Sequence, residues 1–100
     1  IYTFPSYHLM IMQINFKKLK IDKEIFLKKL INSKIYCQYH YIPTYRFKPF
    51  NFFKQKKLEN SEAYFKNSIS IPIYFSLKIG EQNFVINKIK SIINKYEKNY

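Results

Sequence analysis

A nearly continuous apolar run at residues 7–15 (YHLMIMQIN) constrains the fold of this chain most strongly. The run is far shorter than the roughly 20 apolar residues that span a bilayer, so we expect no membrane partner. Because its apolar residues do not alternate with polar ones, the run is typical of a β-strand covered on both faces. One covering layer would have to come from polypeptide that this sequence does not contain, which favours a fragment of a larger protein.

After this run, the hydrophobic spacing alternates between helix and strand periods. Residues 16–20 are predicted to be a polar turn, and Asp22 is predicted to cap a helix that stops at residues 32–34. The positions expected to face the core from this helix are Ile21, Ile25, Phe26, Leu30 and Ile31. Residues 35–41 are predicted to be a second strand, which Pro43 ends because proline cannot donate to a sheet ladder.

The second half of the chain begins with a long aromatic and basic connection at residues 43–58, and connections of this length are usually functional or mobile. A helix from Asn60 or Ser61 to Asn67, a strand at residues 68–74 and a final helix from Gly80 are predicted to follow. Pro72 indicates that the last strand is short or lies at an edge. The final helix presents one apolar face, made of Val85, Ile86, Ile89, Ile92, Ile93 and Tyr96. The order strand, helix, strand, loop, helix, strand, helix predicts a small α+β domain of about three strands.

Composition limits the partners of this domain. A chain of 100 residues that is 47% hydrophobic predicts one folded domain and excludes a disordered tail. The 18 basic and 6 acidic residues give a net charge of +12, but Arg46 is the only arginine, and arginine is what specific nucleic-acid interfaces favour. The lysines are therefore interpreted as a solvated face, without a specific nucleic-acid partner. The alternatives left open are a small basic module that binds RNA and a purely structural interaction domain.

The soft metal ligands of the chain are too few for a metal site. A structural zinc site needs four ligands at tight spacing, whereas the sequence offers only His8, Cys37 and His40. A Cys-His nucleophile is also not expected, because Cys37 and His40 point to opposite faces of an extended strand. The single cysteine fits a reducing compartment and predicts a cytoplasmic protein.

Strand alternation places two polar side chains together. Gln38 and His40 share one face of the predicted strand, and Cys37, Tyr39 and Tyr41 share the other. The first interpretation is that Gln38 and His40 form the wall of a polar pocket, next to a loop that holds Tyr45 and Arg46. The second is that His40 is a half-buried histidine with its hydrogen bonds satisfied and Tyr41 a core ring, and composition alone favours this one.

The motifs SYHLMIMQIN, QYHYIPTYR and NSEAYFKNSISIPIY, in this order and with a helix near GEQNFVI, resemble one known pattern. It is the C-terminal region of the sugar-nucleotide aminotransferases of the DegT/DnrJ/EryC1/StrS family, which carry an HLY-type strand, a QVHYxP segment and an AE…SLPL tail. The resemblance covers residues 6–96. Within the family, the HYIP and YR motifs are most similar to those of enzymes that aminate UDP-4-keto-6-deoxy sugars on the way to pseudaminic acid.

This resemblance implies that residues 1–100 are the C-terminal small domain of a fold-type I transferase that uses pyridoxal 5'-phosphate (PLP). It implies a UDP-sugar substrate, glutamate as the amino donor and a homodimer in the full-length enzyme. The family's cofactor-binding lysine lies upstream in the large domain, and no lysine here stands in a matching context, so the isolated chain is expected to be inactive.

The resemblance also implies which residues contact the substrate. The segment that matches Gln38, Tyr39, His40 and Tyr41 lines the nucleotide-sugar site, with His8 and Tyr45 as further candidates. The family often has glycines where Lys34 and Tyr36 stand, a proline at Phe75 and a Ser or Thr cap near Lys78. These departures concern the geometry of loops.

Overall fold

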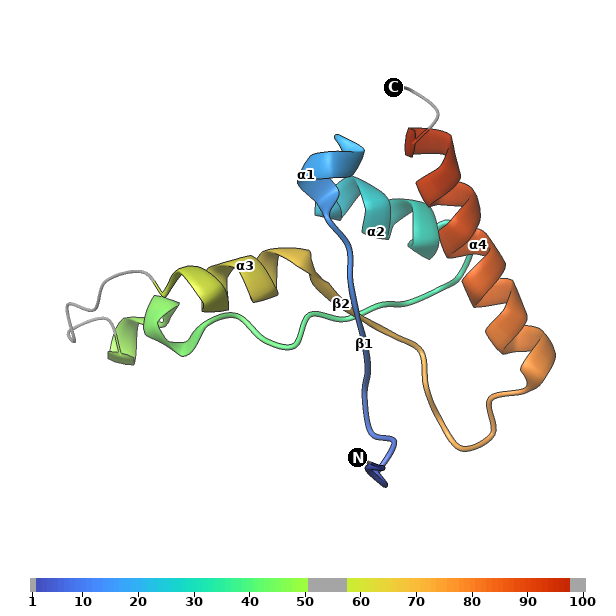
Figure 1. Cartoon of the computed structure of the whole chain (residues 1–100), viewed down its shortest axis with the longest axis horizontal. Helices are drawn as coiled ribbons and strands as arrows, with labels where there is room; N and C mark the ends of the chain where they lie inside the picture. Colours follow the sequence, from blue (N-terminus) through green and yellow to red (C-terminus); the bar gives the residue numbers. More distant parts are fainter. Residues whose placement is uncertain (1, 51–57, 98–100) are drawn as a thin grey trace.

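The computed structural model describes residues 2–50 and 58–97 and has the α+β architecture that the sequence predicts (Figure 1). Its elements are β1 (Met10–Gln13), α1 (Phe16–Leu19), α2 (Lys23–Ile31), the 3-10 turns η1 (Thr44–Arg46) and η2 (Lys48–Phe50), α3 (Glu59–Asn67), β2 (Ser68–Ile71) and α4 (Ile79–Glu97). None of the helices in these described ranges is long and apolar enough to cross a membrane.

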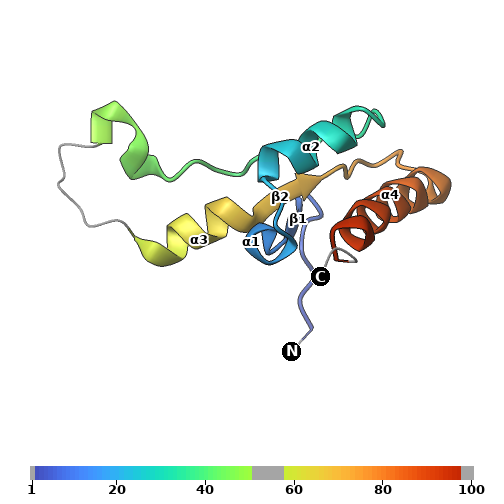
Figure 2. The same cartoon turned by 90° about the horizontal axis from the view of Figure 1, so that it is seen from above.

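One hydrophobic core joins the sheet to α1, α2 and α4. Its members are Ile14, Phe16, Leu19, Ile21, Phe26, Leu27, Leu30, Ile35, Ile69, Val85, Ile89 and Ile92. Phe26 and Leu30 of α2 and Ile69 of β2 are fully buried at its centre. The Phe16 ring meets Phe26 edge-on at 5.4 Å between centroids, a favourable aromatic geometry. The α3 helix and the η1–η2 segment extend away from this core on the side opposite α4 (Figure 2).

The sheet is smaller than predicted. β1 and β2 pair antiparallel, with Met10 opposite Ile71 and Gln13 opposite Ser68. The predicted strand at residues 35–41 is reduced to a single bridge between Gln38 and Ser70. The reason lies in β2, which ends at Ile71 just before Pro72 and so offers few backbone groups for a third strand. β2 therefore lies between β1 and the Gln38 bridge, so Pro72 shortens the strand and does not mark an edge.

The strand predicted at residues 7–15 is present in a shorter form, and its second covering layer was expected from polypeptide outside this sequence. Only Met10–Gln13 is extended in pairing, and Met10 and Ile11 are 44% and 37% exposed. Met12 packs against the core, whereas Met10 and Ile11, which point to opposite faces of β1, are open to solvent.

Two helical predictions also need correction. Residues 16–20, predicted to be a polar turn, form α1, because Phe16 and Leu19 are buried and Asn15 accepts a capping hydrogen bond from the Lys18 amide at 2.9 Å. In α2 the buried face is Phe26, Leu27 and Leu30, whereas Ile25 and Ile31 are 45% and 47% exposed. Asp22 occupies the N-cap position of α2 without a capping hydrogen bond from its side chain.

The second half follows the predicted order. α3 begins at Glu59 after Leu58, one or two residues before the predicted caps Asn60 and Ser61. The α4 helix buries Val85, Ile89 and Ile92 as its spacing predicts. The connection at residues 43–58 contains the turns η1 and η2, and its residues 51–57 lie outside the described part of the chain.

Candidate functional site

The backbone of Gln38 is fixed to the centre of the sheet. Its amide donates to the Ser70 carbonyl at 3.1 Å, and the Ser70 amide donates to the Gln38 carbonyl at 2.8 Å. His40, two residues further along the chain, also contacts Ser70: its Nδ1 is hydrogen-bonded to the Ser70 Oγ at 2.5 Å. A half-buried imidazole is thus oriented by a hydroxyl of β2 that is itself almost inaccessible to solvent.

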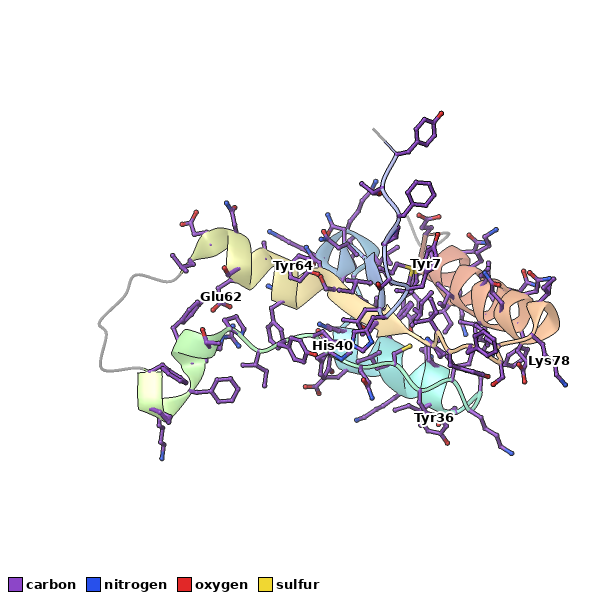
Figure 3. The ribbon with its side chains drawn as sticks, turned by 90° about the horizontal axis from the view of Figure 1, so that it is seen from below. Tyr7, Tyr36, His40, Glu62, Tyr64 and Lys78 are labelled. Carbon is purple, nitrogen blue, oxygen red and sulfur yellow. The ribbon has the colours of Figure 1, made fainter. Side chains whose placement is uncertain are left out.

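Gln38 and His40 line a pocket of about 450 Å³ that we call the His40 pocket. Its lining is His8, Leu9, Tyr36, Gln38, His40, Tyr41, Ser70, Ile71, Pro72, Ile73 and Tyr74. Four of the six residues predicted to bind substrate, namely His8, Gln38, His40 and Tyr41, are therefore brought together (Figure 3 labels His40 and Tyr36). Ser70, Tyr36 and Tyr74 were not among the predicted site residues, although the alternation in SISIPIY places Ser70 on the opposite face from Ile69.

Tyr41 lies on a different side from the one that alternation predicts. It was expected beside Tyr39, but it lines the His40 pocket, and its ring meets the His40 ring edge-on at 4.6 Å. The backbone is not a regular strand after Gln38, so the two-residue period ends there.

Tyr39 lies away from the His40 pocket, as strand alternation predicts, and so does not line it with the other residues of the segment that the resemblance implies to bind substrate. The Lys23 Nζ lies 4.4 Å from the centre of the Tyr39 ring and 4.9 Å from that of Phe65, and it donates to the Phe65 carbonyl at 2.6 Å. Burial lowers the pKa of Lys23. The pKa of Tyr39 is raised, mainly by burial and further by the charge of Glu24. The role of Tyr39 here is to pack between α2 and α3.

Tyr45 lies in a second, adjoining pocket. That pocket measures about 460 Å³ and is lined by Tyr41, Ile42, Pro43, Thr44, Tyr45, Leu58, Asn60, Ser61 and Tyr64. The Tyr45 hydroxyl donates to Glu62 Oε1 at 2.7 Å, and the Arg46 Nε donates to the same oxygen at 3.0 Å. Tyr41 lines both pockets, so the two pockets adjoin at this residue.

No group of three metal-ligating side chains is present among residues 2–50 and 58–97. Cys37 packs against the core.

We expect Cys37 to react slowly with alkylating reagents at neutral pH. Burial raises the pKa of its thiol from 9.0 to about 11. Since the thiolate is the reactive form, labelling by iodoacetamide should be about a hundredfold slower in the folded chain than in urea. Equal rates in the two conditions would contradict the buried position of this thiol.

The chemistry of the His40 pocket suits a neutral polar ring. Its side chains offer an imidazole, an amide, a serine hydroxyl and tyrosines, which donate and accept hydrogen bonds and present aromatic faces. No lysine or arginine occurs among the described residues that line it. The pocket therefore does not fit a cofactor held through a lysine, whereas it fits the hydroxyl groups of a sugar.

This geometry is compatible with both interpretations of His40, as part of a polar pocket wall and as a structural histidine. The imidazole is half-buried and hydrogen-bonded, as a structural histidine would be, and it also lines a pocket together with Gln38. The contact with Ser70 occupies Nδ1, so a ligand in the pocket would meet Nε2.

Residues 3–90 match the model of the DegT/DnrJ/EryC1/StrS aminotransferase family. The chain is 32% identical over 89 residues to the UDP-4-amino-4,6-dideoxy-N-acetyl-beta-L-altrosamine transaminase of Campylobacter jejuni subsp. jejuni serotype O:2, covering 85% of this chain and 23% of that protein. The chain thus spans about a quarter of the length of the curated relatives it matches.

Solved structures share the fold. Helicobacter pylori PseC, an aminotransferase involved in the biosynthesis of pseudoaminic acid, aligns with a TM-score of 0.80 and 21% identity over 88% of this chain and 24% of its own. The sugar aminotransferase Spr1654 of Streptococcus pneumoniae, described as putative and solved in a PLP-form, aligns with a TM-score of 0.74 and 19% identity over 89% of this chain and 23% of its own.

Proposed function

The chain belongs to the DegT/DnrJ/EryC1/StrS aminotransferase family, and on this premise we propose that residues 1–100 are the C-terminal small domain of a PLP-dependent transaminase. The proposed reaction is amination of C4 of a UDP-4-keto-6-deoxy sugar, with glutamate as the amino donor, in the pathway to pseudaminic acid. The name of the Campylobacter jejuni relative supports the sugar class.

The His40 pocket is the observation that carries this proposal. It gathers His8, Gln38, His40 and Tyr41 around one hollow of about 450 Å³, which lies in the size range of small-molecule sites. In the proposed enzyme these groups bind and orient the sugar by hydrogen bonds and by contact with aromatic faces. Tyr45 reaches the substrate through the adjoining pocket, whereas Tyr39 supports the site by packing on Lys23.

PLP is the cofactor of this family, and when bound it supplies the amino-group chemistry. Because no lysine lines the described part of the His40 pocket, we propose that parts of the enzyme outside this chain hold the cofactor. The isolated chain would then be inactive, and the complete enzyme would be a cytoplasmic homodimer without a specific nucleic-acid partner.

A chimera tests the proposed function. The matching quarter of the Campylobacter jejuni transaminase is replaced by this chain, and transamination of its UDP-amino sugar is assayed. We expect activity at least about a hundredfold above a control in which the segment is a flexible linker of equal length, since a misplaced site costs about that much. A folded, PLP-loaded chimera no more active than the linker control would overturn the proposal.

A further inference from the structure

Glu62, in the middle of α3, is hydrogen-bonded to a turn sixteen and seventeen residues earlier in the chain. Its Oε1 accepts from the Tyr45 hydroxyl at 2.7 Å and from the Arg46 Nε at 3.0 Å. Its Oε2 accepts from a terminal nitrogen of the same guanidinium, which makes the ion pair bidentate. The Glu62 side chain is 19% exposed, so these bonds are partly shielded from water. Figure 3 shows Glu62 between α3 and the η1 turn.

The segment that Glu62 holds has little other structure. Between the bridge at Gln38 and the end of η2 at Phe50, the backbone forms no β-strand. The η1 turn in this segment is a 3-10 turn of three residues. The Arg46 guanidinium also lies over the Phe65 ring, with its Cζ 5.2 Å from the centre. The Glu62 carboxylate and the Phe65 ring therefore hold the η1 turn against α3, together with a hydrogen bond between Tyr45 and the backbone of Leu58.

This attachment determines the shape of the pocket that adjoins the His40 pocket. Tyr41 and Tyr45 come from the attached segment and Tyr64 comes from α3, so their mutual distances depend on how the two elements are joined. A short helical turn has few internal hydrogen bonds, and without the attachment its side chains would sample several positions.

A carboxylate suits this role better than an amide. Arg46 needs two acceptor oxygens for its fork, and Tyr45 needs an acceptor for its hydroxyl. The pKa of Arg46 is raised chiefly by its hydrogen bond to Glu62, and that of Tyr45 is raised by burial and by the same carboxylate. Arg46 stays charged and Tyr45 stays protonated, so both remain donors to Glu62 at neutral pH.

We propose that Glu62 is a positioning residue for the nucleotide sugar: it fixes Tyr45, and through the η1 turn the ring of Tyr41, in the geometry that receives the substrate. This inference rests on the proposed function. Glu62 lines neither the His40 pocket nor the adjoining one, but a third pocket that Arg46 also lines, so it acts on the proposed sugar site through Tyr45 and Arg46.

The test uses the active chimera with Glu62→Gln, which keeps one acceptor oxygen and loses the bidentate pair. We expect the KM for the nucleotide sugar to rise about threefold to thirtyfold while kcat changes less than about twofold, because binding geometry is lost and the chemical step is untouched. The matched control is Glu59→Gln, which removes the same charge from an exposed position of the same helix and should leave the KM unchanged.

A second variant keeps the inference testable if Glu62→Gln folds poorly. Arg46→Lys preserves the charge but cannot form the fork, so it should raise the same KM. Combining Glu62→Gln with Tyr45→Phe should raise the KM by less than the product of the two single effects, because both changes break one attachment. If the chimera that carries the unmodified chain is inactive, the result counts against the proposed function. An active chimera in which Glu62→Gln and Arg46→Lys keep the KM of Glu59→Gln would overturn the positioning role.

Discussion

Replacing Leu30 by alanine is expected to lower the free energy of unfolding by about 2–5 kcal/mol. Leu30 is fully buried between α2 and the rest of the core, so the change removes packed methyl groups and leaves a cavity that helices and sheet cannot close. Urea denaturation of the wild-type and variant chains, followed by circular dichroism, measures the difference. The described part of the chain has a small core, so such a loss would take a large part of the total stability.

Ile31→Ala is the matched control for this experiment. Ile31 is the next residue of the same helix and has a side chain of equal size, but it is 47% exposed. We expect its substitution to cost less than about 1 kcal/mol, since much of its surface is already in water. Similar losses for the two variants would show that α2 presents a different face to the core.

The helices could be predicted from the sequence better than the faces they bury. In KEIFLKKLI apolar residues occur on more than one side, so the spacing allows a face with Ile25 and Ile31 as well as one with Leu27. Only packing against α4 and β2 chooses between them. In α4 the apolar stripe is single, and the predicted residues Val85, Ile89 and Ile92 are buried.

The short helix α1 was not predicted, because its lysines made the segment read as a polar turn. The signal was present, however, in the spacing of Phe16 and Leu19 and in the asparagine that precedes them. Strand lengths were less accessible, because they depend on pairing between distant segments. The single bridge at Gln38 follows from the shortness of β2, which lies about thirty residues further on.

In the candidate site, too, the features set by local sequence could be predicted and those set by tertiary packing could not. Strand alternation predicts that Gln38 and His40 share a face and that Tyr39 does not, and the structure confirms both. Ser70 and Glu62 could not be connected to the site from the sequence, because each meets its partner through the fold. Residue types and local period thus predict one wall of the pocket, and tertiary packing supplies the other.

His40→Ala is the second change for which a large effect is expected. The imidazole lines the proposed sugar pocket, with Nδ1 held by Ser70. Removing it deletes one hydrogen bond to the substrate, which typically contributes about 0.5–1.5 kcal/mol, and more where a partner is left unpaired. We therefore expect kcat/KM for the nucleotide sugar to fall roughly threefold to hundredfold.

Tyr39→Phe is the control for His40→Ala. Tyr39 is adjacent in sequence, but its ring lies over Lys23, on the other side from the His40 pocket. Loss of its hydroxyl should leave the kinetics of both half-reactions close to those of the unmodified chimera.

The absorbance of the cofactor follows the two half-reactions of the chimera separately and so tests the proposed site most directly. The account predicts that His40→Ala slows the nucleotide-sugar half-reaction and leaves the glutamate half-reaction and PLP binding nearly intact, with Tyr39→Phe unchanged in both. A sugar half-reaction at the unmodified rate in His40→Ala, or an equal loss in both halves, would contradict it and leave His40 as a structural histidine.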